Sequence, residues 1–121
     1  MSKFLIRETA SGFKFDLLAL NGQVILTSEV YTSRAAARKG IASIRLIAPA
    51  APLENLTEPG SPACPNPKFE LYQDRAGKYR FRLKARNGKI VGISEGYSSK
   101  TGCLNGIDSV RNNANQAETE E

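Results

Sequence analysis

The sequence lacks histidine altogether, and only two of its 121 residues are cysteine. Without histidine there is no Ser-His-Asp triad, Cys-His dyad or ordinary zinc site. Cys64 and Cys103 lie far apart, without metal-ligand spacing, as expected in a reducing compartment. No phosphate loop or dinucleotide fingerprint is present. We therefore predict that the protein is not an enzyme and has no catalytic residues, metal site or cofactor.

Long apolar runs are also missing. No segment approaches the roughly 20 apolar residues needed to cross a bilayer, and the N-terminus lacks the apolar core of a signal peptide. The apolar fraction of 40% and the charged fraction of 24% are typical of a folded globular protein. We expect a cytoplasmic protein that does not associate with membranes.

The chain contains an internal repeat. Shifting the sequence by 66 positions aligns 13–45 with 79–111 without a gap, and 13 of these 33 positions are identical. Chance would give about two or three identities, so the repeat is the first feature that any interpretation must explain. In the first copy the identical residues are Phe15, Leu17, Ala19, Asn21, Gly22, Ser28, Glu29, Tyr31, Ser33, Gly40, Ile41, Ser43 and Arg45.

Proline marks the boundary between the two copies, because all six prolines fall within residues 49–67. We therefore divide the chain into repeat 1 (residues 1–48), a Pro-rich, extended linker (49–67), repeat 2 (68–114) and a disordered acidic tail (115–121).

Each copy contains the dipeptide Asn-Gly between two alternating apolar runs, a strong signal for a β-hairpin with a type I′ turn. A two-residue turn would place Ala19 opposite Val24 and Leu17 opposite Leu26, with the equivalent pairs in repeat 2. It would also place Lys14 opposite Glu29 and Arg80 opposite Glu95 as cross-strand ion pairs. A shorter strand, at 4–8 or 69–73, precedes each hairpin.

A helix is predicted after each hairpin, capped by Ser33 or Ser99, with Thr32 and Ser98 as competing caps. Apolar residues then recur at helical spacing and form one stripe on each helix. These residues are Ala37, Ile41, Ile44 and Ala48 in repeat 1, and Cys103, Ile107, Val110 and Ala114 in repeat 2. The predicted fold is α+β: two tandem βββα repeats, each an antiparallel meander covered by one helix, in a pseudo-twofold arrangement. Whether the two sheets join edge to edge or face to face stays open.

Both copies carry Asn-Gly, then Ser-Glu-x-Tyr-x-Ser, then Gly-Ile-x-Ser-Ile/Val-Arg. In this order the motifs resemble the duplicated branch of the small bacterial YegP-like family. The resemblance implies three strands and a helix per repeat, with the two repeats forming a pseudo-twofold unit. It implies no established activity, so no catalytic residue is carried over. The long Pro-rich linker departs from the usual pattern.

A row of basic residues in repeat 2 suggests nucleic-acid binding. Arg80, Arg82, Lys84 and Arg86 alternate with apolar residues, so a strand would place them on one face, and Lys89 follows the turn. Such a row can neutralise phosphates. The alternative interpretation is a solvated face that keeps the sheet soluble, and repeat 1 does not reproduce the row.

The strand-to-helix junctions suggest a second kind of site. Ser28, Tyr31 and Ser33 in repeat 1, and Ser94, Tyr97 and Ser99 in repeat 2, could form two equivalent sites for an anion or small ligand at helix N-termini. Alternatively, Ser33 and Ser99 only cap the helices, Glu29 and Glu95 pair with the cross-strand bases, and the tyrosines pack over the junctions. We expect a binding or interaction module of unknown specificity, monomeric with an internal pseudo-dimer, whose partner is a protein or a nucleic acid.

Overall fold

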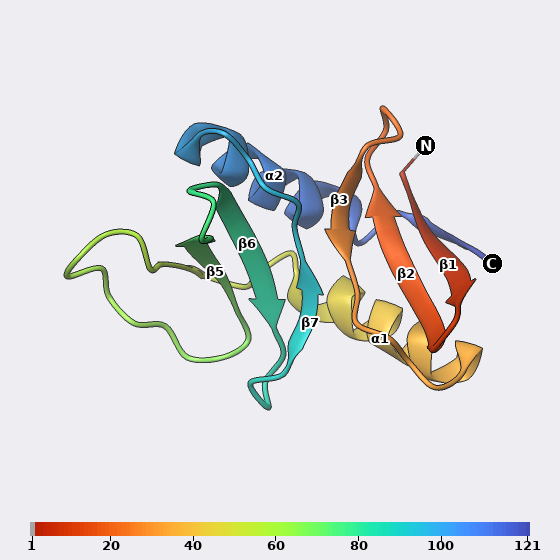
Figure 1. Cartoon of the computed structure of the whole chain (residues 1–121). Helices are drawn as coiled ribbons and strands as arrows, with labels where there is room; N and C mark the ends of the chain where they lie inside the picture. Colours follow the sequence, from red (N-terminus) through yellow and green to blue (C-terminus); the bar gives the residue numbers. More distant parts are fainter. Residues whose placement is uncertain (1) are drawn as a thin grey trace.

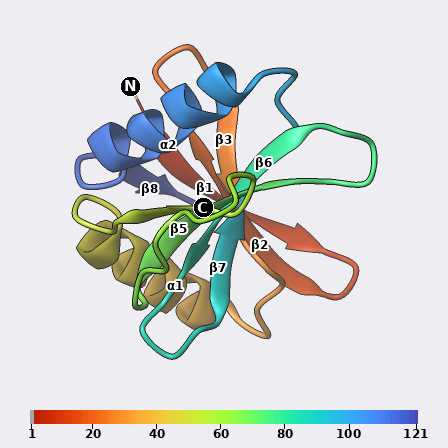
Figure 2. The same ribbon diagram turned by 90° about the vertical axis from the view of Figure 1, so that its left-hand side faces the viewer.

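The computed structural model describes residues 2–121 and shows a single mixed sheet with two helices. In repeat 1, β1 (Lys3–Thr9), β2 (Gly12–Leu18) and β3 (Val24–Thr27) form a meander that leads into α1 (Arg34–Ile47). In repeat 2, β5 (Lys68–Gln73), β6 (Tyr79–Lys84) and β7 (Ile90–Ile93) lead into α2 (Lys100–Asn113). Both helices lie on the same side of the strands (Figures 1 and 2). The predicted pair of βββα units is confirmed.

The two meanders join edge to edge. Their last strands, β3 and β7, run antiparallel and share one residue pair, Thr27 with Ile93. Gly92 helps this joint form, because a Cβ atom there would lie 2.6 Å from Cγ of Leu26 in the other repeat. The missing side chain therefore lets the two cores merge into one.

Two further strands lie in segments that the sequence predicted to be linker and disordered tail. β4 (Leu53–Asn55) follows α1 and pairs in parallel with β5, whereas β8 (Glu118–Glu120) follows α2 and pairs in parallel with β1. The sheet order is β4-β5-β6-β7-β3-β2-β1-β8. Each repeat thus adds its last strand to the outer edge of the other repeat, and we call β4 and β8 the crossing strands.

The prediction of a disordered tail at 115–121 is therefore wrong. Ala117 is buried, and the acidic residues that follow it meet bases of repeat 1: Lys3 contacts Glu120, and Arg38 forms a two-point ion pair with Glu121. Exposed ion pairs contribute little individually. The backbone pairing with β1 orders the segment, and an apolar pattern cannot reveal such pairing.

One arginine from each helix binds the chain at or just before a crossing strand. Arg45 of α1 donates to the carbonyl of Ala117 and to Oγ1 of Thr119, while Arg111 of α2 donates to the carbonyl of Ala51 at 2.8 Å. The same guanidinium groups lie over the rings of Phe4 and Phe69. These identical residues of the repeat therefore connect the helices, the core and the crossing strands.

The hairpin turns differ from the predicted type I′ geometry. Among residues 2–121 only glycines have positive φ, and Gly22 lies at +82°. The Gly22 amide donates to the carbonyl of Ala19, and Asn21 Oδ1 accepts from the Gln23 amide. This three-residue loop needs one residue of positive φ instead of two, because its glycine forms a bulge.

The loop shifts the register at the end of each hairpin. Leu17 faces Leu26 and Leu83 faces Gly92, as predicted, but Val24 faces Leu18 instead of Ala19. In repeat 2, Ile90 likewise faces Lys84 instead of Ala85. The extra residue of the bulge accounts for the shift in both copies.

The core lies between the helices and one face of the sheet. All eight residues of the two predicted helical stripes are buried, and the strands contribute four fully buried phenylalanines to the same core. These are Phe4, Phe15, Phe69 and Phe81. Gly40 and Gly106 admit the tyrosines of the strand-to-helix junctions, since an added Cβ would lie 2.3 Å from Oη of Tyr31 or 2.4 Å from Oη of Tyr97.

Mutation can test whether Arg45 and Arg111 hold the crossing strands in place. We expect Arg45→Ala to release β8 and Arg111→Ala to release β4, each lowering the free energy of unfolding by about 1.5–3 kcal/mol, as for hydrogen bonds to charged groups. Urea unfolding measures the energy, and amide hydrogen exchange shows which strand opens. Faster exchange of the same strand in both variants would contradict the crossed arrangement.

Candidate ligand site

The predicted basic row lies on β6, on the sheet face opposite the helices, but carboxylates neutralise much of it. Nε of Arg80 lies 2.7 Å from Oδ2 of Asp74. Nε of Arg82 lies 2.7 Å from Oε1 of Glu70, which Lys84 also approaches at 3.2 Å. Three of the five predicted phosphate-binding residues are therefore already paired.

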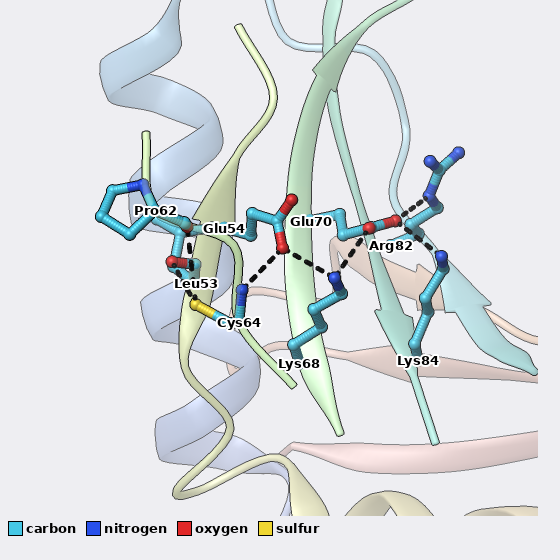
Figure 3. Close-up of polar contacts among 8 residues, drawn as sticks. All are labelled: Leu53, Glu54, Pro62, Cys64, Lys68, Glu70, Arg82 and Lys84. Carbon is cyan, nitrogen blue, oxygen red and sulfur yellow. Dashed lines mark hydrogen bonds and ion pairs between the residues drawn. The ribbon is translucent and has the colours of Figure 1, made fainter. Parts of the chain in front are cut away.

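Glu70 is the centre of this network (Figure 3). Its side chain is only 6% exposed and lies among Arg82, Lys84 and Lys68, and Lys68 in turn binds Oε1 of Glu54 at 2.7 Å. Burial alone would raise the pKa of Glu70, but the hydrogen bonds from Arg82 and Lys84 outweigh it and hold that pKa below its ordinary value. Glu70 is therefore a fixed countercharge.

Glu54 extends the network into the linker. Its Oε1 atom also accepts a hydrogen bond of 2.8 Å from the backbone amide of Cys64. The bonds from Lys68 and from this amide lower the pKa of Glu54. The carboxylate thus attaches the loop that follows β4 to the edge of the sheet (Figure 3).

Arg86 and Lys89 do not continue the row. Both are exposed in the loop between β6 and β7, and neither forms an ion pair within residues 2–121. The register shift near Lys84 separates them from the strand positions. The structure therefore does not bring the five basic residues into one row of free cations.

The junction residues have structural contacts in both repeats. Oγ of Ser28 accepts from the amide of Phe15 and donates to the carbonyl of Glu29, and Ser94 makes the same two bonds with Phe81 and Glu95. Ser33 and Ser99 cap the helices by accepting from the amides of Ala36 and Gly102. The helix caps are as predicted.

The two tyrosines complete each junction. Tyr31 stacks on Phe15 and Tyr97 on Phe81, with ring centroids 5.9 and 6.3 Å apart. Burial, followed by the charge of Glu29, raises the pKa of Tyr31. The tyrosines and capping serines therefore belong to the packing of each repeat and do not gather into two separate pockets.

One pocket instead lies where the two repeats meet and is shared by both junctions. It has a volume of about 460 Å³ and is lined by Lys14 of β2, Arg80 of β6, the Thr27–Ile93 pair, Ser28, Ser94 and Glu95. Lys14 and Arg80 occupy equivalent positions of the repeat, so the pseudo-twofold arrangement places one cation from each half at the same opening. Ser28 and Ser94 thus belong to one shared pocket.

The predicted ion pairs of Lys14 with Glu29 and of Arg80 with Glu95 do not form within residues 2–121. β3 and β7 end at Thr27 and Ile93, so neither glutamate lies in a strand, and Arg80 binds Asp74 instead. Lys14 consequently has no carboxylate partner within residues 2–121. Sequence reasoning missed Lys14 as a site residue because it assigned this base to Glu29.

Comparison with known proteins places the duplicated architecture in a family. Residues 9–54 and 74–121 each match the profile described as "Domain of unknown function (DUF1508)". The chain belongs to the DUF1508 family. It is 38% identical over 112 residues to "UPF0339 protein YegP" of Escherichia coli O157:H7, covering 90% of this chain and 86% of that protein.

Other relatives show both the duplicated and the single form of the domain. A solution NMR structure of YegP from E. coli, described as a protein of unknown function, matches with a TM-score of 0.80 and 33% identity, over 98% of this chain and 90% of that one. A UPF0339 protein of Methanosarcina acetivorans is 60% identical over 50 residues, which are 41% of this chain but 86% of that protein. The DUF1508 unit therefore also occurs as a single copy.

Two further findings bear on the possible sites. Within residues 2–121, neither helix is long and apolar enough to span a bilayer. Over the same residues, no three cysteine, aspartate or glutamate side chains are grouped as metal ligands would be.

The Glu70 network predicts an acid dependence of stability. Because the pKa of Glu70 is lower in the folded than in the unfolded chain, its contribution is complete above the ordinary value of 4.5 and is lost as the pH falls through the lower folded value. We expect the melting temperature to fall between about pH 5 and pH 3, and to fall less in Glu70→Gln. Glu8→Gln, which removes an exposed carboxylate, is the control and should keep the wild-type slope. An equal slope in Glu70→Gln would contradict the assignment.

Proposed function

We propose that this protein is a non-enzymatic binding module that holds a small anionic ligand in the central pocket shared by its two repeats. The observation that carries the proposal is the pairing of Lys14 and Arg80 at equivalent positions around one opening of about 460 Å³. This volume lies within the usual range for small-molecule sites.

The two cations differ in their freedom to bind. Arg80 uses Nε on Asp74 and Nη1 on the carbonyl of Ser94, which fixes its position, and within residues 2–121 Nη2 has no hydrogen-bond acceptor and can donate to a ligand. Lys14 is the charge that a ligand would neutralise. Glu95 also lines the pocket, where it can accept a hydrogen bond from a protonated ligand group. A small anion that also carries a donor, such as a phosphate monoanion, matches this set.

The remaining reactive groups support binding without catalysis. The carboxylates of Glu54, Glu70 and Asp74 all have pKa values below their ordinary range because basic side chains and backbone amides bind them. They are therefore poor proton acceptors near neutral pH. Burial raises the pKa of the Cys103 thiol to about 11, so that group stays protonated within the core.

Nucleic-acid binding is the alternative that the basic row suggested. The contacts of Asp74 and Glu70 reduce the charge that Arg80, Arg82 and Lys84 can offer to phosphates. We accordingly expect no retardation of DNA or RNA in a native gel at about 50 mM salt. Retardation that Arg82→Glu plus Lys84→Glu abolishes would favour nucleic acid over a small anion.

The anion site can be tested by titrating the ¹⁵N-labelled protein with inorganic phosphate and pyrophosphate. We expect amide shifts around Lys14, Thr27 and Ser94, and about tenfold weaker binding in Lys14→Met, equivalent to about 1.4 kcal/mol. Lys39→Met removes an exposed lysine of α1 and should bind as the wild type does. The proposal fails if neither anion shifts these amides at about 10 mM, or if Lys14→Met binds unchanged.

A further inference from the structure

A second concavity shares no lining residue with the central pocket and is formed largely by the Pro-rich linker. It has a volume of about 370 Å³. One wall is the C-terminal end of α1 with the segment that follows it, and the opposite wall is the Pro65–Pro67 segment that leads into β5. We call this concavity the linker groove. Three of the six linker prolines, Pro52, Pro65 and Pro67, thus line this groove.

The linker groove is held open by contacts of its own backbone. The carbonyl of Ala51 accepts from Arg111, and its amide donates to the carbonyl of Ile47. The carbonyl of Pro52 accepts from the amide of Phe69 at 2.8 Å, which attaches the α1 side to β5. Proline also restricts φ in both walls. A ligand would therefore meet a preformed site, which lowers the entropic cost of binding.

The lining is apolar except at two positions. Leu46 on its rim is 81% exposed, more than the other large apolar side chains that stand in solvent. Alanines and prolines form most of the remaining surface, and Asn66 is the one uncharged polar residue among the lining residues. A ligand that covered Leu46 and the proline rings would bury apolar area, the main source of favourable binding energy.

Arg86 is the one charged residue that lines the groove. It forms no ion pair within residues 2–121, so its charge is available at the end of an apolar surface. An arginine presents its donors in a planar fork that fits a carboxylate at two points. A single cation without a neighbouring acid selects a monoanion, and the apolar walls select an aliphatic chain.

We propose that the linker groove binds a small aliphatic carboxylate, with the carboxylate on Arg86 and the chain along Leu46 and the prolines. This site is separate from the central pocket and does not depend on the function proposed above. It also gives a role in binding to the long Pro-rich linker, the segment in which this chain differs from the usual pattern of the family.

The pseudo-twofold arrangement supplies an internal comparison. The equivalent place on the other half is lined by Ser2, Leu20, Asn113 and Gln116, of which the last three correspond to Arg86, Ile47 and Ala50. That counterpart has a leucine in place of the cation and amides in place of the apolar wall. The substitution Arg86→Leu therefore gives the groove the residue that the other repeat carries at this position.

The experiment uses the full-length ¹⁵N-labelled protein with octanoate as the probe. Octanol, which has a chain of the same length without the charge, is the control. We expect octanoate to shift the amides of Leu46, Ala50 and Asn66, and to leave those of Leu20, Asn113 and Gln116 unchanged. Arg86→Leu should weaken octanoate binding at least about tenfold, the usual order for loss of a charge-assisted contact. Lys89→Leu removes a neighbouring exposed cation that does not line the groove and should not weaken binding.

Several outcomes would overturn this proposal. These are no groove shifts at about 10 mM octanoate, equal binding of octanol, or unchanged affinity in Arg86→Leu whose thermal melt shows an intact fold. A tripeptide with a leucine C-terminus is tested in the same way. If the tripeptide binds and octanoate does not, the occupant is a peptide terminus instead. Lys14→Met should bind octanoate as the wild type does, which separates this result from failure of the central site.

Discussion

The pairing of each crossing strand with the opposite repeat is the constraint on which the rest of the structure depends. β4 leaves repeat 1 and covers the edge of β5, and β8 leaves repeat 2 and covers the edge of β1. The direct joint between the meanders is a single residue pair of β3 and β7. The crossing strands therefore supply most of the backbone connection between the halves, and they fix the pseudo-twofold relation that brings Lys14 and Arg80 together.

Within this shared frame the two repeats have diverged in charge. On the open face of repeat 1, Asp16 accepts bonds from Arg7 and Thr27. The equivalent position of repeat 2 holds Arg82, which binds Glu70. Each half thus has an ion pair at this position, but the acid and the base have exchanged places between the two repeats. Both repeats still contribute one cation, Lys14 or Arg80, to the central pocket. The proposed linker groove reflects the same divergence, because repeat 1 has Leu20 at the position that Arg86 occupies in repeat 2.

The sequence predicted what depends on local periodicity. The helical stripes, the serine caps and the order of strands follow from spacing within each copy, and the structure agrees with them. The turn type was wrong because Asn-Gly is compatible with both a two-residue and a three-residue loop, and the bulge that distinguishes them shifts Val24 by one position. β4 and β8 were missed because three-residue edge strands have no apolar alternation to detect.

The candidate sites were less accessible to sequence reasoning, for a related reason. The alternation around Arg82 correctly indicated a shared sheet face, but the partners of that row, Glu70 and Asp74, come from a neighbouring strand and the turn after it. Lys14 and Arg80 meet only because the halves are related by a pseudo-twofold axis, so the repeat itself was the one signal that could have paired them.

The pairing of β1 with β8 joins Lys3 to Glu118, and therefore nearly the first described residue to nearly the last. Contacts of such long sequence separation close large loops, and chains rich in them fold more slowly than chains of local contacts. Each meander can form from nearby residues, whereas the outer edge of repeat 1 stays uncovered until α2 has packed and β8 has arrived. We therefore expect the two meanders to form first and the pairing of β8 with β1, which closes the longest loop, to form last.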